Sequence, residues 1–156
     1  MTDGRRVVEL ALRELGELDR RFSSEFRPYK SFRYANAGGA IHWGIATQKS
    51  TVTNVHDDTG TPQTRIAAQL TIDRGEESGG ILASLMNERQ SVEQALGHRL
   101  SWLDGGDNGK RQRALVRSWR ALEGDEGTLA AWLAAEMLQL RAALQPHVLK
   151  LGHQVP

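Results

Sequence analysis

Apolar side chains recur at steps of three and four residues in three parts of the chain, and each part is predicted to be an amphipathic helix. These helices are expected over roughly 4–23, over roughly 79–96 and from about residue 126. Gly97 follows the second helix where a left-handed cap is typical, and Pro146 is expected to kink or end the last helix. The apolar side of the first helix consists of Val8, Leu12, Leu15, Leu18 and Phe22.

Alternation of apolar and polar side chains predicts strands between these helices, because successive side chains of a strand point to opposite faces. Gly38 and Gly39 form a turn, since glycine accepts the positive φ of tight hairpins. Residues 49–63 and 104–110 are polar and rich in turn formers, which favours exposed loops. Strands are expected over 31–36, 40–48, 64–73, 100–103 and 113–122.

The resulting order is α-β-β-β-α-β-β-α, and residues 1–156 are expected to form a single α+β domain. Short, hairpin-length connections favour a mainly antiparallel or mixed five-stranded sheet with the helices packed on it. On the 64–73 strand, Ile66, Ala68, Leu70 and Ile72 are expected to face the core. The side chains expected in one core are Leu12, Leu15, Leu70, Ile72, Leu85, Leu96, Trp102, Val116 and Leu140.

Composition narrows the function classes only slightly. The chain has no cysteine, which excludes disulfides, thiolate catalysis and cysteine zinc sites. Its net charge of +1 gives no global attraction to nucleic acid or membrane. No apolar run reaches the roughly 18 residues that span a bilayer, so we expect a cytoplasmic protein with no membrane partner.

The order of the first helix, three strands, second helix and fourth strand resembles the core of restriction-endonuclease-like nucleases. Such a fold needs a carboxylate and a lysine on its third strand to hold a divalent metal and position a water. Here Gln69 and Thr71 occupy those positions, and Asp73 is a single carboxylate at the strand end. The sequence therefore predicts no metal site, no cofactor and no catalytic residue, and leaves a degenerate nuclease fold as an alternative.

Two basic clusters are the candidate binding residues. Arg113 and Arg117 are expected on one strand face with Trp119, solvent-accessible and extended by Lys110 and Arg111. Basic groups interleaved with an aromatic ring suit a nucleic-acid backbone. The alternative is that these arginines only keep the uncovered sheet face soluble. The second cluster, at the end of the first helix and in the first strand, includes Arg27 and Arg33.

Several segments resemble a bacterial family known as domain of unknown function 4268. They are GGAIHWGIAT, RIAAQLTID, LMNERQSVEQALGHRLSW and WLAAEMLQLRAALQPHVLKL, and the resemblance runs from about residue 5 to 151. Its most specific part is the G-x-x-L-x-W element formed by Gly97, Leu100 and Trp102. Domains of this family occur alone or attached to larger proteins, some of them nuclease-like and defence-associated. The resemblance therefore implies an accessory role linked to nucleic acid, and it transfers no catalytic residue.

The leading hypothesis is a non-catalytic binding module that contacts nucleic acid or a nucleic-acid-processing partner. A second hypothesis is a homodimeric protein-interaction domain that uses the uncovered sheet or its edge strand. A third is an enzyme whose site is assembled from residues far apart in the chain, such as His42, Gln69 and Arg117.

Overall fold

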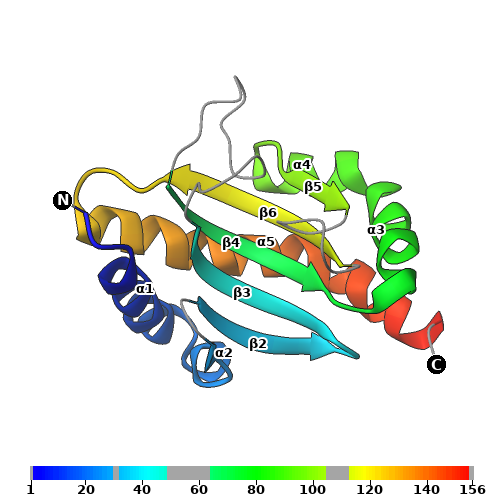
Figure 1. Cartoon of the computed structure of the whole chain (residues 1–156), viewed down its shortest axis with the longest axis horizontal. Helices are drawn as coiled ribbons and strands as arrows, with labels where there is room; N and C mark the ends of the chain where they lie inside the picture. The colour runs from blue at the N-terminus through cyan, green and yellow to red at the C-terminus, as the bar shows by residue number, and fades with distance from the viewer. Residues whose placement is uncertain (1, 30–31, 49–63, 105–112, 155–156) are drawn as a thin grey trace.

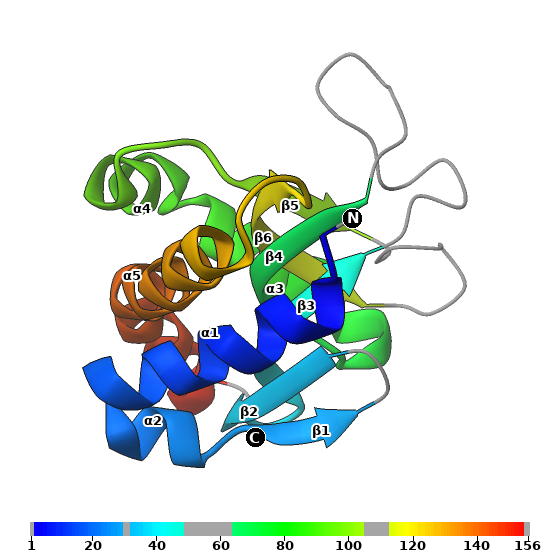
Figure 2. The ribbon, with the colours of Figure 1, turned by 90° about the vertical axis from the view of Figure 1, so that its left-hand side faces the viewer.

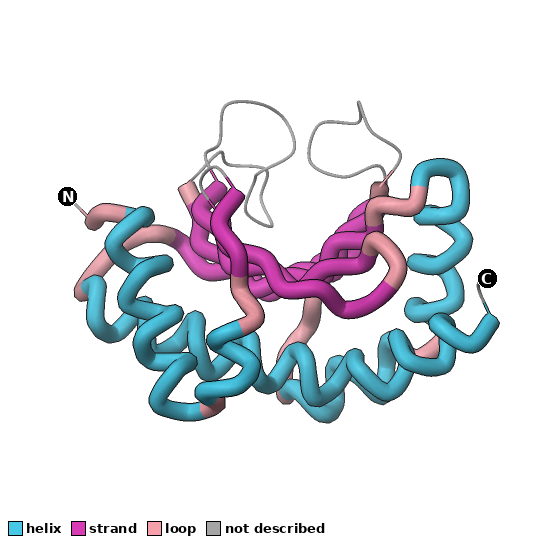
Figure 3. The backbone as a smooth tube through the Cα atoms, turned by 90° about the horizontal axis from the view of Figure 1, so that it is seen from below, coloured by secondary structure: helices cyan, strands magenta, loops and turns pink. Residues whose placement is uncertain are grey.

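One antiparallel sheet runs through the molecule, and the helices lie on one of its faces (Figures 1 and 3). The computed structural model describes residues 2–29, 32–48, 64–104 and 113–154, so the 49–63 loop, Lys110 and Arg111 lie outside the described residues. The described helices are α1 (Gly4–Leu18), α2 (Arg20–Ser24), α3 (Ser78–Met86), α4 (Arg89–Leu96), α5 (Glu126–Gln154) and the short 3-10 helix η1 (Gly75–Glu77). The described strands are β1 (Arg27–Tyr29), β2 (Phe32–Gly38), β3 (Ile41–Gln48), β4 (Arg65–Ile72), β5 (Ser101–Asp104) and β6 (Ala114–Ala121).

The α+β class expected from the hydrophobic pattern is confirmed, with one more strand than predicted. The strand order is β1-β2-β3-β4-β6-β5, and every neighbouring pair is antiparallel. The additional strand, β1, is three residues long, lies at the sheet edge and contains Pro28. Proline interrupts the alternating pattern, but an edge strand tolerates it because one side of the strand has no partner. Gly38 and Gly39 both have positive φ, as the predicted turn requires.

The first two predicted helices are each divided in two. Asp19 ends α1 and begins α2, because its side chain accepts a hydrogen bond from the Phe22 backbone N–H at 3.0 Å. The second predicted helix is interrupted at residues 87 and 88, between α3 and α4. Gly97 caps α4 with a φ of 84°, as expected, whereas α5 continues through Pro146 instead of ending there.

The core lies between the sheet and the helices. α5 runs along one face of the sheet, and α1 packs against α5 on that side (Figure 2). Of the nine predicted core side chains, Leu15, Leu70, Ile72, Leu85, Val116 and Leu140 are at most 2% exposed. The other three, Leu12, Leu96 and Trp102, are partly buried and pack against the core. No helix in the described ranges is both long and apolar enough to cross a bilayer.

The opposite face of the sheet carries none of the described helices (Figure 3). Even so, Arg65 and Gln69, which project from β4 on this face, are only 5% and 6% exposed. β4 lies in the middle of the sheet, between β3 and β6, so its side chains have neighbours on both sides. The Arg65 guanidinium, for example, lies 3.4 Å from the centre of the Trp119 ring.

Replacing Leu70 with Ala should lower the free energy of unfolding by about 2–5 kcal/mol, because a buried leucine leaves a cavity when truncated. The matched control is Leu18→Ala, since Leu18 is 58% exposed and its truncation should change stability by less than about 0.5 kcal/mol. Urea unfolding of both variants measures this difference. Equal losses at the two positions would mean that Leu70 does not lie in the core.

Candidate functional site

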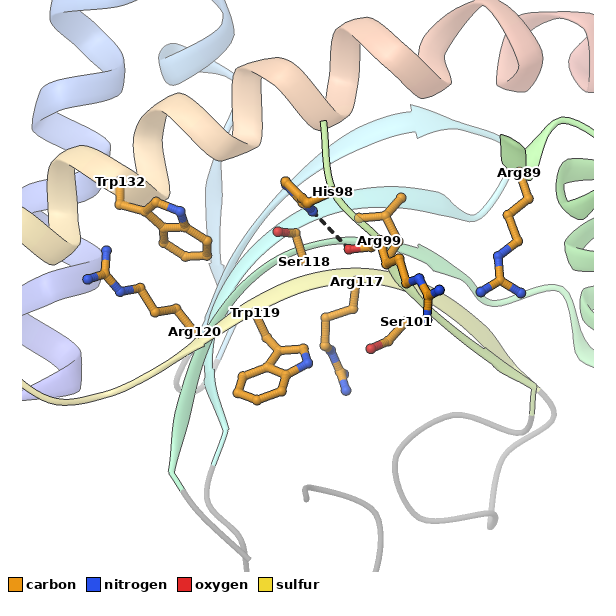
Figure 4. A pocket seen from close by; sticks show the side chains of 10 residues that line it. Arg89, His98, Arg99, Ser101, Arg117, Ser118, Trp119, Arg120 and Trp132 are labelled. Carbon is orange, nitrogen blue, oxygen red and sulfur yellow. Dashed lines mark hydrogen bonds between the residues drawn. The ribbon is translucent and has the colours of Figure 1, made fainter. Parts of the chain in front are cut away.

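A pocket opens where β5 begins. β5 pairs Ser101 with Arg117 and Asp104 with Ala114, so within the described residues the β5-side edge of β6 has no strand partner beyond Arg117. An open cavity of about 780 Å³ lies against this edge (Figure 4), within the usual size range of ligand pockets. It is lined by Arg89, His98, Arg99, Leu100, Ser101, Arg117, Ser118, Trp119, Arg120 and Trp132.

The lining is strongly basic. Five of its side chains are arginine or histidine, and it includes no carboxylate among the described residues. Arg99 and Arg120 are exposed, and no described Asp or Glu lies within ion-pair distance of either one. Trp119 and Trp132 are partly exposed, and the Arg120 guanidinium lies 6.0 Å from the centre of the Trp132 ring. The pocket therefore presents cations and aromatic surface together.

Glu93 of α4 holds the segment that forms one wall of the pocket. Its carboxylate accepts the Leu100 backbone N–H at 2.7 Å and the Trp102 indole N–H at 3.2 Å. Arg89 Nε donates to the same carboxylate at 3.2 Å. Burial alone would raise the pKa of Glu93, but these three hydrogen bonds hold it below its usual value. Glu93 is therefore a positioning residue behind the pocket.

Glu136 of α5 holds the same segment from the other side. Its carboxylate is buried and accepts hydrogen bonds from Ser118 Oγ at 2.7 Å and from His98 Nε2. His98 Nδ1 faces the Arg99 carbonyl oxygen at 2.8 Å. Both partners of the ring are acceptors, and this arrangement favours the imidazolium form of His98, in which both ring nitrogens donate. Burial opposes this charge, but the Arg99 carbonyl and Glu136 offset it, so the pKa of His98 lies above 6.5.

The Ser118, His98 and Glu136 side chains do not form a nucleophilic site. Activation of a serine requires its hydroxyl to donate to the histidine, which then accepts the proton. Here the Ser118 hydroxyl donates to Glu136, and both nitrogens of His98 are already engaged. This arrangement ties the His98 segment and β6 to α5 at the pocket wall.

Arg117 corrects the prediction of an accessible arginine face. It is 1% exposed, although the alternation of β6 correctly places it on the face away from the helices. Its neighbour across the β4 ladder is Gln69, whose Oε1 accepts the Arg117 Nε–H at 3.0 Å. Arg117 therefore belongs to a buried polar network, whereas Trp119 and Arg113 are partly exposed.

The described residues of the two predicted basic clusters lie far apart in the sheet. Arg27 lies on β1 and Arg33 on β2, at the opposite end of the strand order from β6 and β5. Arg27 is exposed and donates through Nη1 to the Ser24 carbonyl at 3.1 Å, while Arg33 is partly buried. Of the predicted binding residues that the structure describes, only Arg117 and Trp119 line the pocket.

The sequence-based prediction missed the pocket residues Arg89, Arg99 and Trp132. They come from α4, from the connection after Gly97 and from α5, which no local pattern links to β6. The available signal was the run Gly97-His98-Arg99, which places a basic pair directly after a helix cap. Arg120 was visible as a basic residue next to Trp119, but its contact with Trp132 was not.

The residues named for an assembled enzyme site share one sheet face. His42, Gln69 and Arg117 lie on β3, β4 and β6, on the side away from the helices. The His42 ring packs edge-on against Tyr34, and burial lowers the pKa of His42 although Asp73 opposes this shift. In the described part of the chain, no three His, Asp or Glu side chains gather as a metal-binding group.

The His98–Glu136 pair should make stability depend on pH. Because the folded-state pKa of His98 is raised, the pair stabilises the fold below about pH 6.5, and this contribution is lost as pH rises through the raised pKa. Unfolding of the wild type and of His98→Ala should therefore differ more at about pH 5.5 than at about pH 9.

A proton NMR titration of His98 measures the same effect at one residue. Glu136→Gln keeps an acceptor for Ser118 and His98 but removes the charge, so it should lower the pKa of His98. A wild-type His98 that titrates at or below 6.5 would contradict the ion pair.

No family model, no curated protein and no solved structure matches this chain. The resemblance to the domain of unknown function 4268 family therefore stays a prediction.

Proposed function

We propose that this chain is a non-catalytic binding module that contacts nucleic acid, and that it does so at the pocket beside the free edge of β6. The observation that carries the proposal is the lining, which combines two tryptophans with Arg99 and Arg120, two exposed arginines that have no described acidic partner. Cationic groups neutralise phosphates, and indole rings offer a surface on which bases stack. Both features are present within one cavity.

The spread of the cations favours a polymer over a single small anion. Figure 4 places Arg120 near one end of the pocket and Arg89 at the other, with Arg99 between them. A site for one phosphate would direct several donors at one point, as a bidentate arginine clamp does. Separated cations instead match the repeated charges of a nucleic-acid backbone.

The biological setting is part of the same proposal. The resemblance noted above supports a bacterial accessory module that acts beside a nucleic-acid-processing protein, including those of defence systems. A nucleic-acid ligand would place the protein in the cytoplasm, and the lack of cysteine suits that reducing compartment.

The double substitution Arg99→Ala and Arg120→Ala should weaken binding of a short fluorescent oligonucleotide at least about ten-fold at low salt. Each lost phosphate contact also reduces the salt dependence, so the slope of log K against log salt should flatten by roughly 1.5. Both side chains are exposed, so the fold should be unaffected. Fluorescence anisotropy between about 50 and 200 mM salt measures both quantities.

The matched control is Arg20→Ala with Arg27→Ala. These two arginines are also exposed and carry the same charge, but they belong to α2 and β1. An equal loss of oligonucleotide affinity in the control would show that binding depends on the net charge of the protein and not on the pocket. Absence of binding by the wild type at about 50 mM salt would end the proposal and favour the protein-interaction hypothesis.

A further inference from the structure

The free edge of β6 presents backbone hydrogen-bonding groups to the pocket. In an antiparallel ladder, the N–H and C=O of one residue point to the same side of the strand, and those of the next residue point to the other side. The Leu122 N–H donates to the Thr64 carbonyl at 3.0 Å, so the even-numbered residues of β6 pair with β4. The backbone N–H and C=O of Trp119 and of Ala121 therefore point toward the β5 side.

At this position β5 no longer covers the edge. The register of β5 with β6 ends at the Ser101–Arg117 pair, two residues before Trp119. The Ala121 carbonyl is already used by the Glu123 N–H at 3.0 Å. In the described chain, the edge thus offers one complete adjacent donor and acceptor, the N–H and C=O of Trp119, at a residue that lines the pocket.

The complementary ligand group is planar and carries an acceptor next to a donor. Every nucleobase has such a pair on its Watson–Crick edge. A peptide strand has one too, but strands in sheets usually run for three or more residues, and this edge offers a single complete pair. The basic lining also favours a phosphate-bearing ligand over a peptide.

The two indoles lie on opposite sides of this edge. Trp119 projects from the face of β6 that is away from the helices, whereas Trp132 belongs to α5 on the helix side (Figure 4). A base that hydrogen-bonds to the N–H and C=O of Trp119 would lie in the extended plane of the sheet. Its two flat faces would then be turned toward the two sides from which the indoles reach the pocket.

We propose that the backbone N–H and C=O of Trp119 bind the Watson–Crick edge of an unpaired base, while Arg99 and Arg120 hold the flanking phosphates. This inference rests on the proposed nucleic-acid function and adds the class of ligand. In a duplex, the Watson–Crick edges are occupied by the partner strand, so the pocket selects single strands.

The test compares three probes of equal length at one salt concentration: single-stranded oligothymidylate, its duplex with oligoadenylate, and single-stranded oligo-N3-methylthymidylate. N3 methylation keeps the phosphates and the stacking surface but removes the donor that the Trp119 carbonyl accepts. The plain single strand should bind about ten-fold or more tightly than either of the others, as expected for a bidentate base contact.

The variant Trp119→Phe distinguishes hydrogen bonding by the backbone of residue 119 from stacking on its indole. It keeps the backbone N–H and C=O, so it should bind more weakly but retain the discrimination against N3-methylthymine. Equal binding of methylated and plain single strands by the wild type, or of duplex and single strand, overturns this inference and leaves nucleic-acid contact standing. Failure of all three probes to bind overturns the proposed function itself.

Discussion

The arrangement of the pocket depends on the contacts of the buried Glu136 carboxylate with His98 and Ser118. A carboxylate inside a protein is strongly disfavoured unless hydrogen bonds and an opposite charge surround it. Ser118 supplies a hydrogen bond from the sheet, and the His98 imidazolium supplies the charge from the connection between α4 and β5. One charged group thus joins α5, β6 and that connection. Glu93 joins the same connection to α4 through Leu100.

The same constraint decides which positive charges of the pocket lining are neutralised by an acid. Glu93 and Glu136 are both engaged behind the wall, by Arg89 and by His98, while Arg99 and Arg120 on the rim have no described acidic partner. The same contacts engage both ring nitrogens of His98, with the Arg99 carbonyl and the Glu136 carboxylate. Arg99 and Arg120 are therefore the cations that we propose bind an anionic ligand.

The helical spacing of three and four residues and the alternation of strands were sufficient to predict the α+β class, because burial of one helix side or one strand face is a local property. They correctly placed Leu70 inward and Trp119 outward on their strands. They did not show that Arg117 is buried, since its environment depends on Gln69 of a strand 48 residues away in the chain. β1 was missed because Pro28 is compatible with an edge strand but does not indicate one. The pocket itself joins residues of α4, β5, β6 and α5, and only the packing of these helices on the sheet brings them together.

An NMR titration of the ¹⁵N-labelled protein with single-stranded oligothymidylate tests the central claim most directly. The account predicts that the backbone amides of Trp119 and Arg99 and the indole N–H of Trp132 shift together and saturate at one oligonucleotide concentration. The amides of Arg27 and Arg33, at the other end of the sheet, should not move. Largest shifts at Arg27 and Arg33, or saturable binding that leaves Trp119 unchanged, would contradict the account.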